Sequence, residues 1–130
     1  MKQRISLSIV FFIFGISANA QVLACKKFRN GTFKMTYEGK KGIIKRYNDV
    51  QEEYMNGSGK PTMTFTVKWI SDCIYTLTPT ATTRKEYPDI PKDGTMTVKI
   101  TETTANSYNY SATYSWNKQH VYRNTLTLIK

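Results

Sequence analysis

The chain has 130 residues, with 19 Lys and Arg against 9 Asp and Glu, and a formal net charge of +10 at pH 7. A chain of this length has room for one domain with a single modest core, so a multi-domain enzyme is excluded. The basic balance favours anionic surfaces or acidic partners, or serves solubility alone.

The N-terminal segment has the parts of a secretory signal peptide. Lys2 and Arg4 give it a basic start, an apolar run covers residues 5–16, and small residues precede Gln21. We therefore expect residues 1–20 to be a signal peptide and residues 21–130 to form one exported domain, periplasmic or extracellular. The apolar run is shorter than the roughly 20 residues of a spanning helix, so no transmembrane segment is expected in the mature chain.

Two cysteines, Cys25 and Cys73, would enter an oxidising compartment after export. A disulfide between them is the expected state. The alternative is that residues 22–25 form a lipoprotein cleavage box, so that Cys25 carries a lipid anchor. The apolar run ends well before Cys25, which favours ordinary cleavage and the disulfide.

From Thr32 onwards the sequence alternates apolar and polar residues in short runs separated by turn residues. No stretch shows sustained apolar spacing at the helical period, and Thr, Tyr, Val and Ile are typical of sheets. We expect strands over residues 32–38, 43–47, 50–55, 62–69, 73–77, 95–101, 107–116 and 121–129, with residues 78–83 continuing away from the fifth.

The strongest pattern is a hairpin over residues 62–77. A two-residue loop would set its two apolar rows on opposite faces of the sheet, because side chains alternate along a strand. A three-residue loop over residues 70–72 avoids this and pairs Trp69 with Cys73 and Val67 with Tyr75. The hairpin then has one continuous apolar face, which we expect to form the core.

Eight short strands joined mostly by short turns favour an antiparallel meander. We predict an all-β fold, a small up-and-down, lipocalin-like barrel, with a β-sandwich as the alternative. An eight-stranded barrel has an interior that side chains fill or that one small ligand occupies, and the sequence does not distinguish these outcomes.

Several motifs resemble a group of small secreted bacterial proteins with a lipocalin-like meander. They are Cys25-Lys26-Lys27-Phe28, Gly31-Thr32-Phe33, residues 44–53, and Lys68-Trp69-Ile70-Ser71-Asp72-Cys73 with Tyr75 and Leu77. The resemblance implies the barrel fold but no established activity. Some members bear a topoisomerase name, yet about 110 residues of barrel cannot hold a DNA gate and an ATPase site.

A polar cluster is predicted on the second and third strands. A two-residue turn at Asn48-Asp49 would pair Arg46 with Gln51 and place Glu53 diagonally beside Arg46. If this face points inward, the three side chains lie on an apolar wall, either hydrogen-bonded to one another or orienting a polar group of a ligand. If it points outward, they form a solvated ion pair of about 1 kcal/mol at most.

Aromatic residues supply the other candidate ligand-binding positions. Tyr108, Tyr110 and Trp116 fall on one face of a single strand, together with Tyr114, and Trp69 lies on the core hairpin. Tyr and Trp around a pocket suit a flat or amphipathic ligand. Ordinary core packing explains the same pattern.

The sequence offers little for catalysis. His120 is the only histidine and the cysteines are expected to be paired, so we expect no metal site, no cofactor and no Cys-His dyad. Export makes nucleic acid an unfavourable partner for the basic residues. We therefore expect a non-enzymatic binding barrel for a small apolar or amphipathic ligand; the alternative is a basic interaction or inhibitor module with an acidic partner in the cell envelope.

Overall fold

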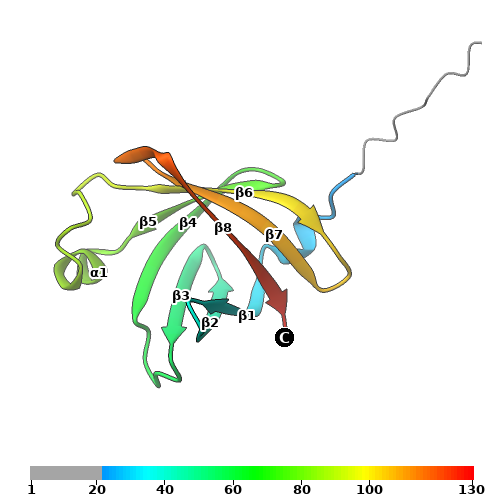
Figure 1. Ribbon diagram of the computed structural model, residues 1–130, viewed down its shortest axis with the longest axis horizontal. Helices are drawn as coiled ribbons and strands as arrows, with labels where there is room; N and C mark the ends of the chain where they lie inside the picture. Colours follow the sequence, from blue (N-terminus) through cyan, green and yellow to red (C-terminus); the bar gives the residue numbers. More distant parts are fainter. Residues whose placement is uncertain (1–21) are drawn as a thin grey trace, which may run out of the picture.

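Eight antiparallel strands close into one barrel in the computed structural model, which describes residues 22–130 (Figure 1). The strands are β1 (Gly31–Tyr37), β2 (Lys40–Tyr47), β3 (Val50–Met55), β4 (Met63–Ser71), β5 (Ile74–Pro79), β6 (Met96–Thr103), β7 (Ser107–Tyr114) and β8 (Asn117–Leu128). Each pairs with its neighbours in the chain, and β8 returns to pair with β1. The predicted up-and-down barrel is confirmed, and the β-sandwich alternative is wrong.

Turn chemistry sets the register between β2 and β3. Asn48 and Asp49 have φ angles of 51° and 62°, the left-handed conformation that a two-residue hairpin turn requires and that Asn and Asp tolerate. Arg46 therefore pairs with Gln51, and Ile44 pairs with Glu53. This register is the predicted one.

The register predicted for the core hairpin is wrong. Trp69 pairs with Tyr75 rather than with Cys73, and Ser71 pairs with Ile74 across a two-residue turn. A two-residue turn alone would set the apolar residues of β4 and β5 on opposite faces of the sheet. A bulge between Trp69 and Ser71 adds one residue to β4 and returns both apolar rows to the same face. The apolar residues of β4 and β5 consequently still share the inward face, although their pairing is shifted by two residues.

The sequence predicts that residues 78–83 carry the chain away from the fifth strand, but it does not predict the helix that the structure has there. The chain leaves β5 at Pro79 and forms the short helix α1 (Ala81–Glu86), where the Thr80 side chain accepts a hydrogen bond from the Thr83 backbone N–H. The Thr83 hydroxyl in turn accepts from the Thr64 backbone N–H at 2.9 Å and donates to the Thr64 carbonyl at 3.1 Å. These bonds fix α1 against the start of β4.

The other end of the barrel is covered by the N-terminal segment. Figure 1 shows residues 22–30 (blue) at the end of the barrel opposite α1. The short 3₁₀ helix η1 (Lys26–Phe28) places the Phe28 ring, fully buried, 5.2 Å from the ring of Tyr108. We call this the closed end and the end with α1 the open end.

A disulfide joins the closed end to the core hairpin, as predicted. The Cα atoms of Cys25 and Cys73 are 5.2 Å apart, and their sulfur atoms are bonded. A cysteine in this bridge has no thiol left to carry a lipid, so the structure favours the bridge over lipid attachment at Cys25. The predicted signal peptide lies outside the described residues. Over residues 22–130 we find no helix with the length and apolarity to cross a membrane.

Candidate ligand-binding cavity

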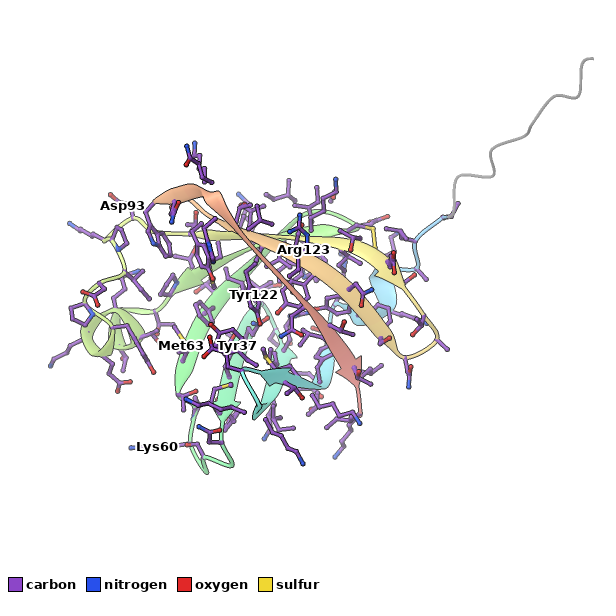
Figure 2. All side chains as sticks on the ribbon, viewed as in Figure 1. Tyr37, Lys60, Met63, Asp93, Tyr122 and Arg123 are labelled. Atoms are coloured by element: carbon purple, nitrogen blue, oxygen red, sulfur yellow. A yellow bond between two sulfur atoms is a disulfide. The ribbon has the colours of Figure 1, made fainter. Side chains whose placement is uncertain are left out.

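The barrel encloses a cavity of about 430 Å³ that reaches the surface at the open end. Its lining is mostly apolar and aromatic: Met35, Tyr37, Ile44, Gln51, Glu53, Met55, Met63, Phe65, Tyr75, Leu77, Pro79, Ile90, Met96, Val98, Tyr110, Ala112, Tyr114, Trp116, His120, Tyr122 and Leu126. Figure 2 shows Tyr37, Met63 and Tyr122 converging on the barrel interior from three different strands. The interior is thus only partly filled by side chains.

Arg46 on β2 organises the polar groups between the cavity and the closed end. It is 1% exposed and donates four hydrogen bonds: Nε to Gln51 Oε1 at 2.9 Å, one terminal nitrogen to the Phe28 carbonyl at 2.8 Å, and the other to the hydroxyls of Tyr75 and Tyr108, both at 2.9 Å. The two hydroxyls also bond to each other at 3.0 Å. A guanidinium has five N–H donors, so almost all of its capacity is used within the protein.

The Arg46 guanidinium remains charged despite its burial. Burial by itself lowers its pKa, but the oxygens of Tyr75 and Tyr108 and the carboxylate of Glu53 outweigh that effect, and the pKa is raised. The Arg46 Cζ atom also lies 4.6 Å from the ring centre of Tyr75 and 5.1 Å from that of Phe33. Aromatic faces of this kind stabilise a buried cation.

Glu53 on β3 carries this polar network into the cavity. Gln51 accepts from Arg46 and donates through its Nε2 to Glu53 Oε1 at 3.1 Å. Burial raises the pKa of the half-buried Glu53 carboxyl, and the hydrogen bond from Gln51 and the charge of Arg46 only partly offset it. Arg46, Gln51 and Glu53 therefore form one relay that ends in a carboxyl group on the cavity wall.

Tyrosines form much of the cavity wall. The ring centres of Tyr110 and Tyr122 are 6.1 Å apart, and that of Tyr37 is 5.5 Å from Tyr122. Burial is the main reason that the pKa values of Tyr110 and Tyr114 are raised, so both phenols are neutral at ordinary pH. They offer the cavity aromatic faces and hydroxyls without charge.

The structure brings some of the predicted ligand-binding residues together and separates others. Gln51, Glu53, Tyr110 and Trp116 line the cavity, with Trp116 in the turn after β7 and 40% exposed rather than within the strand. The other three predicted residues, Arg46, Trp69 and Tyr108, lie outside the lining, toward the closed end. Their inward direction was expected, but they support the cavity floor instead of forming its surface.

Sequence reasoning did not identify the methionines as cavity residues. Met35 and Met55 lie near the ends of β1 and β3, whereas Met63 and Met96 begin β4 and β6. In an up-and-down barrel the ends of odd strands here meet the beginnings of even strands, so all four gather at the open end. The clustering of these methionines could have been predicted from the sequence and an assumed strand order, because each Met falls on the apolar face of its strand.

The cavity lining has no grouping typical of a metal site. His120 is exposed and stacks on Tyr114 with ring centres 5.8 Å apart, and no set of three His, Cys, Asp or Glu in residues 22–130 is placed to share an ion.

Comparisons with protein-family models, with curated proteins and with solved structures each found no match. The geometry of the cavity is therefore the basis for a functional proposal.

Proposed function

We propose that this chain is an exported, non-enzymatic binding protein that holds one small amphipathic molecule inside its barrel. The observation that carries the proposal is the cavity of about 430 Å³, whose lining is mostly apolar and aromatic and has one carboxyl group, that of Glu53, held by Gln51. Small-molecule sites have volumes of roughly 300 to 1,000 Å³ and the same distribution of polar groups. Binding is favoured over catalysis because Arg46 and Gln51 are committed to structural hydrogen bonds rather than to a nucleophile and its base.

Ligand entry should change the fluorescence of Trp116, which lines the cavity, but not that of Trp69, which lies toward the closed end. We expect the Trp69→Phe variant, which keeps Trp116, to show a saturable change in fluorescence with octanol.

Ala112 is buried on β7 and lines the cavity, so Ala112→Phe should fill part of it and weaken octanol binding about tenfold or more. As a matched control, Ser111→Phe lies on the outward face of the same strand and should bind octanol as the parent does. Equal binding by both variants, or no saturation at all, would refute the cavity as a binding site.

Export is the second part of the proposal and is supported by the disulfide, because such bonds persist in oxidising compartments. We expect the protein recovered from the cell exterior or envelope to begin at Gln21. Mass spectrometry of the intact protein tests this, since reduction should add the mass of two hydrogen atoms. A chain that still carries residues 1–20, or an N-terminal Cys25 with a diacylglyceryl group, would contradict it.

A further inference from the structure

The cavity has the opposite charge character from the chain as a whole. The sequence has 19 Lys and Arg against 9 Asp and Glu, yet the described residues that line the cavity include no Lys or Arg and a single carboxyl group, that of Glu53. The nearby Arg46 directs its donors to Phe28, Gln51 and two tyrosine hydroxyls. An anionic ligand would therefore meet a carboxylate without a free cation to pair with.

Glu53 has acceptor capacity that the fold does not use. Its Oε1 accepts from Gln51, and among the described residues no side chain donates to Oε2. An ionised carboxylate has about four acceptor sites, so most of them are open to a donor in the cavity. Because the folded state raises the pKa of Glu53, this group stabilises the fold only when protonated, and that contribution is lost as the pH rises through its folded pKa. The charge of Arg46 partly offsets the burial of an ionised Glu53, but Arg46 directs its hydrogen bonds to other groups, so the acceptor sites of Glu53 stay open to a ligand.

The walls around Glu53 suit a cation joined to an apolar chain. The faces of Tyr110, Tyr122 and Trp116 supply negative electrostatic potential without charge, which attracts ammonium groups. Toward the open end, Met35, Met55 and other methionines offer flexible, polarizable contacts that adapt to an alkyl or aryl tail.

We propose that the ligand is an amphipathic organic cation, an amine with an apolar tail, whose ammonium group donates to Glu53 Oε2 and whose tail lies among the methionines. This inference rests on the proposed binding function and adds the ligand class to it. The ammonium would complete the relay that begins at Arg46 and passes through Gln51. It would also neutralise the one carboxylate of the cavity.

Octylamine, octanol and octanoate share a tail and differ in the charge of the head group, so their affinities isolate the role of Glu53. By calorimetric titration at a pH above the pKa of Glu53, where its carboxyl is ionised, we expect octylamine to bind about tenfold more tightly than octanol, and octanoate more weakly than either. In Glu53→Gln, which keeps the shape and the acceptor for Gln51, the ratio between octylamine and octanol should fall to about one. Glu52→Gln is the matched control, because Glu52 lies on the outward face of β3 bonded to the Tyr54 hydroxyl, and it should keep the wild-type ratio.

The preference for octylamine should also depend on pH. It should be absent while Glu53 is protonated and should appear as the pH rises through the pKa of Glu53, which lies above its ordinary value. The other titratable groups that face Glu53 are Arg46, Tyr110 and Tyr114. Their pKa values are all raised, so Arg46 stays charged and both tyrosines stay neutral in this range. His120 at the cavity opening is removed from the comparison by repeating the titration in His120→Gln.

The outcomes separate the two proposals. If none of the three compounds binds, the proposed function fails and the ligand class fails with it. If octanol binds as tightly as octylamine, or if Glu53→Gln keeps the octylamine preference, the cation proposal is overturned while the binding function stands. Tightest binding of octanoate would also overturn it, since Arg46 would then govern the charge of the ligand. We expect Glu53→Gln to unfold at an equal or higher urea concentration than wild type at pH 7, so loss of preference cannot be attributed to unfolding.

Discussion

Replacing Arg46 by Met should destabilise the barrel by about 3 to 5 kcal/mol, a large part of the roughly 5 to 15 kcal/mol of a typical domain. The change removes four hydrogen bonds at once and leaves the Phe28 carbonyl and Gln51 Oε1 buried without these donors. It also leaves the Glu53 carboxylate without a compensating buried charge. Urea unfolding monitored by circular dichroism measures the loss.

Lys45→Met is the matched control for this variant. Lys45 is adjacent in the chain but exposed, with its ammonium 4.8 Å from the ring centre of Tyr54, and its loss should change stability by only about 0.5 kcal/mol. Arg46→Lys should fall between the two, because an ammonium lacks the planar fork that reaches four acceptors. Equal midpoints for Arg46→Met and Lys45→Met would show that the network around Arg46 contributes nothing to stability.

The fold was predictable because strand alternation is a local property of the sequence. The β2–β3 register followed from Asn48 and Asp49, whose side chains tolerate the left-handed turn. The position of Gln51 opposite Arg46, and therefore the whole relay to Glu53, depended on that turn alone. This is the part of the candidate site that sequence reasoning placed correctly.

The errors arose where a tertiary contact decides the local structure. The bulge between Trp69 and Ser71 adds a residue without disturbing the apolar pattern on either side, so alternation cannot reveal it. Helix α1 has no apolar periodicity over its six residues, and what holds it is the bonding of Thr83 to the Thr64 backbone. For both segments the sequence pattern alone favours an extended strand.

Which inward-facing residues would form the cavity and which the packed floor depends on where the covering segment lies. The apolar ring of Phe28 fills the closed end, and the Phe28 backbone carbonyl accepts a hydrogen bond from Arg46. Arg46 and Tyr108 lie in the floor beside this contact, Tyr75 bonds to Arg46 and also lines the cavity, and Glu53 and Tyr110 lie on the cavity side. The division of the barrel into floor and cavity is thus set by a segment that belongs to no strand.

Removing the disulfide should have the second large effect, a loss of about 4 kcal/mol in the chain-entropy account of a bridge between residues 48 positions apart. Apart from the buried Phe28, the closed-end segment is attached by surface contacts, including Lys27 Nζ to the Ala105 carbonyl at 2.7 Å and Arg29 to Asp72 at 3.3 Å. Exposed contacts of this kind contribute little. The double variant Cys25→Ser with Cys73→Ser, compared with wild type in urea, measures the loss without leaving a free thiol.

The same variant tests whether the bridge and the Arg46 network act on one structural unit. Without the bridge, Phe28 should be held less firmly, so its carbonyl contact with Arg46 is already weakened before Arg46 is replaced. The serine pair combined with Arg46→Met should therefore cost less than the sum of the separate losses, by about 0.5 kcal/mol or more. Strictly additive losses would mean that the closed-end segment and the cavity floor are stabilised independently. An unchanged midpoint in the serine pair alone would mean that the bridge constrains a segment that contributes nothing to the barrel.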